Sequence, residues 1–287
     1  PGYLSLTSTF DVASGSEVKY NFLTIFSTAA WGLGYFGMPH ILVRFMAIED
    51  EKKLVLSRRI ASVWVVIAMT AGVLIGIVGL GMTKAGALET LTGSNSETII
   101  VRIAGIISQH NALTALIAGI ILAGILAATM STADSQMLAA ASGVSQNIVH
   151  DFLKIKISEK TNLLIARLTI VGIAIVSIFL ARNPDSSVFK IVSFAWAGFG
   201  GAFGAVVLCS LFWKRCNLAG AIAGIISGGA TVFIWKYLIR PLGGILDIYE
   251  LLPAFIVSLI FIIVVSLLTK APDEEIVREF EAAGKKA

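Results

Sequence analysis

Residues 110–152 read HNALTALIAGIILAGILAATMSTADSQMLAAASGVSQNIVHDF, a stretch that begins as an apolar membrane helix and turns polar in its middle. The polar part, residues 131–136, contains no Gly or Pro that would end a helix. Because backbone groups in hydrocarbon must be satisfied within their own segment, we expect one helix to continue through it. Together with similar apolar stretches elsewhere, it predicts an all-α fold class and a polytopic membrane protein.

Oxygen-bearing side chains gather on one face of this predicted helix. At about 100° per residue, Ala128, Ser131, Thr132 and Ser135 fall on one stripe, and Asp134 lies on its flank. Small hard cations prefer oxygen ligands, and ionisable residues inside membranes are functional by default. The pattern therefore predicts a cation site. The alternative is that the hydroxyls bond back to their own helix and only bend it.

The composition excludes a soluble domain. The 287 residues are 56% hydrophobic and only 14% charged, whereas soluble domains have about 25% charged residues. The net charge of +4 comes without a Lys/Arg run, so we expect no nucleic-acid partner. Cys209 and Cys216 match no metal spacing and no disulfide framework. The chain opens on Pro1 without a signal peptide, and we expect a fragment of a longer protein.

Seven stretches are apolar enough to span a bilayer, which takes about 20 residues. The predicted spans are residues 20–48, 55–82, 111–150, 162–181, 187–213, 217–239 and 249–269. Together they make a transmembrane region over 20–270. Residues 96–108 are shorter and amphipathic, which is typical of an interfacial helix. We expect residues 1–19 to form an extracellular loop and residues 271–287 a charged cytoplasmic tail.

Lys and Arg are unevenly distributed among the predicted loops. They are more frequent after the first, third and fifth spans and in the tail than in the loops between. Cytoplasmic loops carry this excess in membrane proteins. The bias predicts an extracellular N-terminus and a cytoplasmic C-terminus in the plasma membrane, an arrangement that seven spans satisfy.

Glycines recur at four-residue spacing in three of the predicted spans. The sets are Gly72 with Gly76, Gly200 with Gly204, and Gly220 with Gly224 and Gly228. Faces of small residues at this spacing let membrane helices approach closely. We therefore interpret these glycines as packing positions, not as ligand sites.

The first predicted span is interrupted at its centre. Residues 27–46 read STAAWGLGYFGMPHILVRFM, in which three glycines and Pro39 fall within eight residues. These residues weaken a helix, and proline disfavours helical backbone at the preceding residue. Broken helices at membrane depth mark substrate sites in transporters. Trp31 and Tyr35 flank the break and could wall a small organic solute; the alternative is an interfacial aromatic belt.

The chain resembles the sodium/solute symporter family, and within it most closely the carriers of proline. The resemblance rests on WGLGYFGMPHILVRFMA (31–47), ILAATMSTADSQML (125–138), VSFAWAGFGGAFGAVVL (192–208) and LAGAIAGIISG (218–228). The family folds as two inverted five-helix repeats with extra helices at the ends. The resemblance implies that this chain is the second repeat plus C-terminal helices, with the N-terminal half of the same transporter as its missing partner.

The resemblance also assigns a sodium site. The family's ligands on the eighth core helix map onto the Ala128 carbonyl and the Ser131 and Thr132 hydroxyls, the stripe described above. The coupling ion would then be Na⁺. Asp134 is not a general sodium ligand of the family. Its expected role is a second cation contact, a cytoplasmic exit step, or a salt bridge to an arginine such as Arg167.

Substrate contacts of the proline carriers map onto Trp31, Tyr35 and Pro39. The implied function is sodium-coupled symport of a small organic solute across a bacterial plasma membrane by alternating access, with L-proline as the first choice. Other amino acids, betaine-like osmolytes, pantothenate and sugars are the alternative substrates. The resemblance implies no enzymatic activity.

Three other functions are alternatives to sodium symport. Proton coupling would use Asp134 if burial raised its pKa. An intramembrane serine protease would need a base within reach of Ser131, but the histidines, His40, His110 and His150, lie near span ends. A sensor that reuses the fold would need a signalling domain, and the short C-terminal tail does not provide one.

Overall fold

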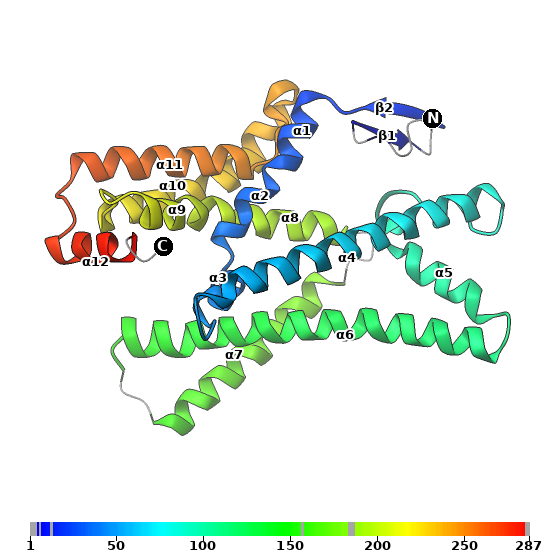
Figure 1. Cartoon of the computed structure of the whole chain (residues 1–287), viewed down its shortest axis with the longest axis horizontal. Coiled ribbons are helices and arrows are strands. Elements are labelled where there is room, and N and C mark those ends of the chain that lie inside the picture. The colour runs from blue at the N-terminus through cyan, green and yellow to red at the C-terminus, as the bar shows by residue number, and fades with distance from the viewer. Residues whose placement is uncertain (1–4, 6, 12–13, 156–157, 183–186, 285–287) are drawn as a thin grey trace. The chain divides into compact units, whose positions relative to one another are not determined.

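The computed structural model describes the chain except for residues 1–4, 6, 12–13, 156–157, 183–186 and 285–287 (Figure 1). The chain divides into two compact units. Unit 1 comprises Pro1–Leu42 and Val192–Ala287, and unit 2 comprises Val43–Ile191. The described elements are helical apart from one two-stranded hairpin, which confirms the predicted all-α fold class.

Six helices of the described chain are long and apolar enough to cross a membrane. They are Lys53–Lys84, Ala112–Phe152, Glu159–Leu180, Val188–Phe212, Leu218–Leu242 and Leu251–Leu268. Each overlaps one of the predicted spans. The remaining predicted span, residues 20–48, is divided among short helices, none of which has the length of a membrane crossing.

Helices make up most of the described part of unit 2. They are α4 (Lys53–Lys84), α5 (Ile99–Ser108), α6 (Ala112–Ser142) and α7 (Glu159–Leu180). Helix α5 packs on α4 and α6, and α7 packs on α6. A 3-10 turn, η2 (Gly93–Thr98), precedes α5, and α6 continues as a π-helix, η3 (Gly143–Phe152). The polar part of α6 is therefore helical, as predicted.

Side-chain caps define where several helices of unit 2 begin. Asn111 and Thr114 form a reciprocal capping box at the start of α6, and Ser158 caps α7. Glu97 reaches from η2 to the start of α8 (Val188–Phe199). Its carboxylate accepts hydrogen bonds from the Ser187 hydroxyl at 2.5 Å and from the Val188 N–H at 3.0 Å.

Unit 1 begins with a hairpin that the sequence analysis did not predict. Strands β1 (Ser8–Asp11) and β2 (Ser16–Lys19) pair antiparallel, and Gly15 supplies a turn residue with φ +64°. The short helices that follow are α1 (Phe22–Ala29), α2 (Trp31–Gly34), the 3-10 turn η1 (Tyr35–Gly37) and α3 (Pro39–Met46), whose last turn enters unit 2.

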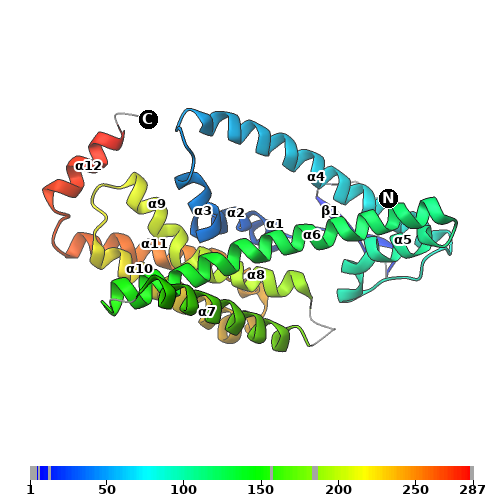
Figure 2. The same cartoon turned by 90° about the horizontal axis from the view of Figure 1, so that it is seen from below.

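The rest of unit 1 is a packed block of C-terminal helices. After α8 come the π-helix η4 (Gly200–Gly204), α9 (Ala205–Phe212), α10 (Leu218–Ile234), η5 (Trp235–Ile239), η6 (Arg240–Leu242), η7 (Gly244–Leu246), α11 (Leu251–Leu268) and α12 (Glu274–Gly284). Figures 1 and 2 both show α10 beside α11, which is its principal packing partner. The buried core of the block is formed by residues of α8, α9, α10 and α11, with α2 packed against it.

Glycines make the close contact between α10 and its neighbours. A Cβ atom added to Gly220 or Gly224 would clash with side chains of α11, and one added to Gly228 would clash with the carbonyl of Gly201 in η4. The prediction that this glycine set serves packing is confirmed. Gly72 in α4 differs, because nothing in the described chain lies within 4 Å of the corresponding position.

Candidate functional site

The predicted break in the first span is present. Helix α2 ends at Gly34, the turn η1 ends at Gly37, and Met38 adopts extended backbone with φ −87° and ψ 110° before α3 begins at Pro39. Proline fixes this geometry, because its ring disfavours helical backbone at the preceding residue and its nitrogen cannot donate. The break is thus encoded locally, by Pro39 and the turn before it.

Two glycines at the break have a second role that the sequence analysis missed. A Cβ atom on Gly34 would overlap the Trp196 side chain, and one on Gly37 would overlap the carbonyl of Phe199. The backbone of the break therefore lies directly against the end of α8 and the start of η4. These glycines are required for close approach as well as for weakening the helix.

Four rings surround the break, and we call Trp31, Tyr35, Trp196 and Tyr249 the aromatic cluster. Trp31 stacks on Trp196 with centroids 5.8 Å apart and on Tyr249 at 5.9 Å. Tyr35 meets Trp196 edge to face at 4.8 Å. The Trp196 Nε1 also donates to the Trp31 carbonyl at 3.0 Å. Such pairs are favourable beyond the area they bury, so the cluster orders the break.

The structure brings two of the three predicted substrate residues together. Trp31 and Tyr35 both contact Trp196, whereas Pro39 begins the next helix with an exposed side chain. Trp31 is half-buried and packs against the buried core cluster of the block. Tyr35 is 55% exposed, so part of its ring is free to meet a ligand.

The predicted cation ligands lie together on α6. The Ser131 hydroxyl donates to the Ala128 carbonyl at 3.3 Å, and the Thr132 hydroxyl donates to the same oxygen at 3.1 Å. Ser135 donates to the Ser131 carbonyl at 2.9 Å. The hydroxyls thus bond back to their own helix, as the alternative interpretation describes. The same geometry gathers three oxygens, all neutral, at one exposed place on the helix.

Asp134 is exposed on the same helix. Among the described ion pairs, none includes Asp134 or Arg167. Within the described residues, no group of three His, Cys, Asp or Glu side chains is placed to hold a metal ion. The oxygens gathered at Ala128, Ser131 and Thr132 are all neutral, and hard cations prefer oxygen ligands.

No histidine of unit 2 is placed to activate Ser131. The His110 Nδ1 lies 3.2 Å from the Ile106 carbonyl, and the His150 Nδ1 lies 2.8 Å from the Asp151 carboxylate. The Ser131 hydroxyl is bonded to the Ala128 carbonyl instead. The arrangement lacks the contact between nucleophile and base that a serine hydrolase requires.

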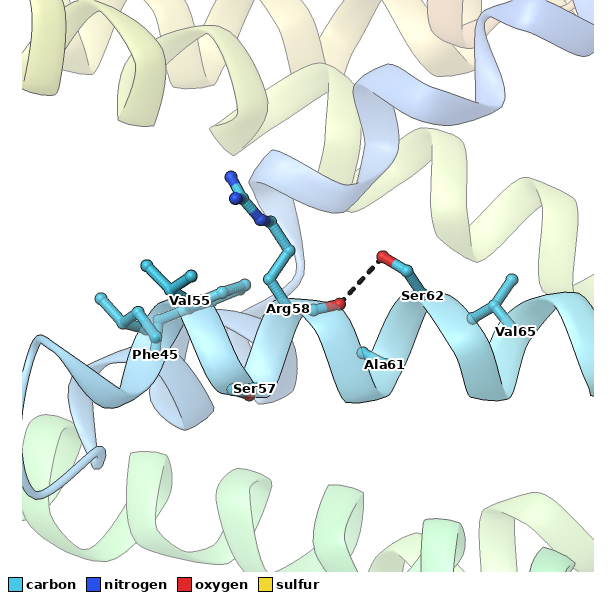
Figure 3. A pocket seen from close by; sticks show the side chains of 8 residues that line it. Phe45, Val55, Ser57, Arg58, Ala61, Ser62 and Val65 are labelled. Carbon is cyan, nitrogen blue, oxygen red and sulfur yellow. Dashed lines mark hydrogen bonds between the residues drawn. The ribbon is translucent and has the colours of Figure 1, made fainter.

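A separate shallow pocket of about 720 Å³ lies at the start of α4 (Figure 3). Its lining is mostly apolar and comprises Phe45, Leu54, Val55, Ser57, Arg58, Ala61, Ser62 and Val65. The Ser62 hydroxyl donates to the Arg58 carbonyl at 2.8 Å, so this hydroxyl is already satisfied within the helix. The pocket includes none of the predicted site residues.

Comparison with known proteins identifies relatives over most of the chain. A family model described as the sodium:solute symporter family matches residues 6–228. A sodium/proline symporter of Escherichia coli (strain K12) is 40% identical over 264 residues, which cover 92% of this chain and 51% of that protein. An osmoregulated proline transporter of Bacillus subtilis (strain 168) is 40% identical over 270 residues, covering 94% of this chain and 52% of that protein.

A third relative gives the same result. A sodium/proline symporter of Haemophilus influenzae is 39% identical over 264 residues, which cover 92% of this chain and 51% of that protein. The chain thus spans about half the length of the curated relatives it matches. No solved structure matches the chain.

Proposed function

We propose, because this chain belongs to the sodium:solute symporter family, that its helices form the C-terminal half of a sodium-coupled carrier for a small organic solute. L-proline is the proposed substrate, since the relatives described above are named for proline transport at 39–40% identity. The proposed setting is a bacterial plasma membrane, with the start of this chain outside and its end in the cytoplasm. The uneven distribution of Lys and Arg supports that orientation.

The interrupted helix with its aromatic cluster is the observation that carries the substrate proposal. Tyr35 lies in the turn where the backbone leaves the helical path between Gly34 and Pro39, and Trp31 begins the short helix before that turn. An unwound segment frees backbone carbonyls for an ammonium group, and the start of a half-helix attracts a carboxylate. The rings would close around the apolar part of the solute. Proline, which has all three features, is complementary to such a site.

For the sodium ion, we propose binding at the Ala128 carbonyl and the Ser131 and Thr132 hydroxyls. Each hydroxyl oxygen keeps lone pairs while its hydrogen points to the Ala128 carbonyl. An ion that takes all three oxygens would displace both hydrogen bonds, and the two hydroxyl hydrogens would rotate away. Helices of the N-terminal half would supply the remaining ligands.

Coupling follows from linkage between the two ligands. If sodium binding favours the conformation that accepts the solute, sodium raises the affinity for the solute. By linkage, the solute then raises the affinity for sodium by the same factor. The driving force is the sodium gradient plus about 2.3 kcal/mol per charge for each 100 mV of membrane potential. Release inside would follow from rocking of helices around a nearly fixed site.

The experiment that tests this function is uptake of labelled proline by proteoliposomes that contain the full-length carrier. Uptake is compared with an inward sodium gradient, with potassium in its place, and with a pH gradient alone. We expect uptake only with sodium. Undiminished uptake in potassium would contradict sodium coupling, and uptake driven by the pH gradient would favour protons. Competition by other amino acids, glycine betaine, pantothenate and glucose tests the substrate assignment. A compound that inhibits uptake more strongly than unlabelled proline would become the proposed substrate in place of proline.

A further inference from the structure

Glu250 is a buried carboxylate that the proposed transport cycle does not use. It directly precedes α11 and is only 2% exposed, the one charged side chain classed as buried in the described chain. Its Oε2 accepts from the Arg240 Nη1 at 2.8 Å, and its Oε1 lies 3.9 Å from the Lys236 Nζ. Arg240 also binds Asp247 at 2.8 Å. We call these four residues the ion-pair network.

The ion-pair network joins η5 and η6, which follow α10, to the start of α11. A buried carboxylate is costly unless cations and hydrogen bonds compensate it. Here two cations from η5 and η6 converge on Glu250, and the Lys236 ammonium also lies 3.5 Å from the centre of the Phe194 ring. Losing Glu250 would leave both cations without this partner. The network therefore fixes the backbone position from which α11 starts.

Tyr249, which directly precedes Glu250, connects the start of α11 to the residues around the break. Tyr249 is 6% exposed, and its ring stacks on Trp31 at an interplanar angle of 16°. Its hydroxyl donates to the Ser193 carbonyl of α8 at 2.5 Å, and its backbone N–H donates to the Ser27 hydroxyl of α1 at 3.0 Å. One residue thus joins α1, α2 and α8 at the aromatic cluster.

We propose that Tyr249 is a positioning residue for Trp31, and that Glu250 with its cations holds Tyr249 in place. Tyr249 acts on the solute through the orientation of the Trp31 indole, not through contact of its own. The inference rests on the proposed function, because it takes Trp31 as a wall of the solute site. It adds a structural unit, the start of α11, that determines how well this wall fits the solute.

The test is a kinetic comparison in the full-length carrier. Tyr249→Leu removes the ring, Tyr249→Phe keeps the ring and loses only the hydroxyl, and Tyr20→Leu is a matched control at a half-exposed tyrosine outside the cluster. We expect Tyr249→Leu to raise the KM for proline about 2- to 12-fold. This range is the interaction free energy of one aromatic pair, expressed as a ratio of binding constants. The kcat per inserted carrier should stay within about twofold. Tyr249→Phe, which keeps the ring but loses the hydrogen bond to the Ser193 carbonyl, should raise the KM less than Tyr249→Leu, and the control should resemble the wild type.

Glu250→Gln tests the second part, with Glu275→Gln on the exposed start of α12 as its control. We expect the KM to rise in Glu250→Gln and not in Glu275→Gln. If the KM is normal in Glu250→Gln but raised in Tyr249→Leu, the role of the network is overturned. A normal KM in Tyr249→Leu, or a fall in kcat alone, overturns the whole inference. If Tyr249→Leu fails to insert, Tyr249→Met, which fills the space without a ring, decides in the same way.

A double-mutant cycle separates positioning from general packing. If Tyr249 acts through Trp31, Tyr249→Leu should add little to the KM of a Trp31→Leu carrier, since contacting residues are not additive. Full additivity would contradict the inference. The wild type is the reference for the function itself, because absence of sodium-dependent proline uptake there contradicts the proposed function. Should competition reveal another solute, the same measurements are made with that solute.

Discussion

At the scale of single residues, Trp31 and Tyr35 are expected to contribute differently to transport. Trp31 is half-buried, stacks on two rings and accepts a hydrogen bond at its carbonyl, whereas Tyr35 makes one edge contact and is largely exposed. Loss of the Trp31 ring removes a wall of the proposed site and also loosens the cluster. Loss of the Tyr35 ring leaves the fold of the break intact.

We therefore predict that Trp31→Ala lowers kcat/KM for proline about tenfold or more, and that Tyr35→Ala lowers it by a smaller factor. A tenfold loss of kcat/KM corresponds to about 1.4 kcal/mol. Uptake kinetics, normalised to the amount of carrier in the membrane, provide the measurement. Trp64→Ala is the control, because Trp64 on α4 is 68% exposed and outside the cluster. Wild-type kinetics in both site variants would refute the substrate assignment.

The hydroxyls of α6 give a prediction that separates their two interpretations. If Ser131 and Thr132 bind sodium, Ser131→Ala and Thr132→Ala should raise the half-saturating sodium concentration several-fold at saturating proline. If they only bond back to the helix, sodium dependence should not change. Thr129→Ala is the matched control, because Thr129 donates to the Ile125 carbonyl at 2.9 Å and lies off the stripe. Sensitivity of Asp134→Asn alone would instead favour proton coupling.

At the scale of elements, packing of α10 depends on the absence of side chains. The position of a Cβ on Gly228 is blocked by the backbone carbonyl of Gly201, which cannot rotate away, whereas the nearest atoms at Gly224 belong to the side chain of Ile262. We predict that Gly228→Ala lowers the free energy of unfolding by about 1–3 kcal/mol, the usual cost of overpacking, and by more than Gly224→Ala.

Thermal unfolding in detergent measures this difference. Gly172→Ala in α7 is the control, since nothing lies within 4 Å of the added methyl group and alanine favours the helix. A Gly228→Ala protein that melts no earlier than the control would show that α10 and its neighbours are not in close contact.

The start of α8 provides a pH-dependent prediction. The hydrogen bond from the Ser187 hydroxyl, with those from the Phe189 and Val188 N–H groups, holds the pKa of the Glu97 carboxyl below its usual value. A group whose pKa is lower in the folded state stabilises it above the unfolded pKa of about 4.3, and this stabilisation is lost as the pH falls through the folded pKa. The cap on α8 should therefore be intact at neutral pH and released in acid.

Hydrogen exchange at the Val188 and Phe189 amides is the readout, expressed relative to the intrinsic rate at each pH. We predict that Glu97→Ala loses protection there at pH 7, and that acid lowers protection in the wild type but not in the variant. Glu89→Ala is the control, because its exposed ion pair with Arg102 at 3.6 Å contributes little. Equal protection in Glu97→Ala and the wild type would contradict a capping role.

At the scale of the whole molecule, the sequence predicts those features that depend on local chemistry. Hydropathy determines the helical membrane fold, and Pro39 determines the break, because both act within a few residues. The partners of the break were not predictable, since Trp196 and Tyr249 are far from Trp31 in the chain and meet it only after folding. Burial of Glu250 was missed for the same reason.

Similar reasons explain two other features that the sequence analysis did not predict. The hairpin at Ser8–Lys19 is too short to give a clear alternating pattern. Glycine spacing predicts close packing equally well at Gly72 and at Gly220, but only the second has a neighbour in the described chain. Spacing describes a surface, and whether another helix covers that surface depends on the tertiary arrangement.

The contact of Gly37 with the Phe199 carbonyl has a consequence for motion. The two backbones are in contact there, with no layer of side chains between them that could slide or repack. We therefore expect the unwound segment to move together with the end of α8 and the start of η4. Spin labels at Phe36 and Phe203 would then keep one separation through every stage of turnover, with sodium, with solute or with neither. The gating displacement would then arise at other helices, which would rock around this segment while the solute stays beside it.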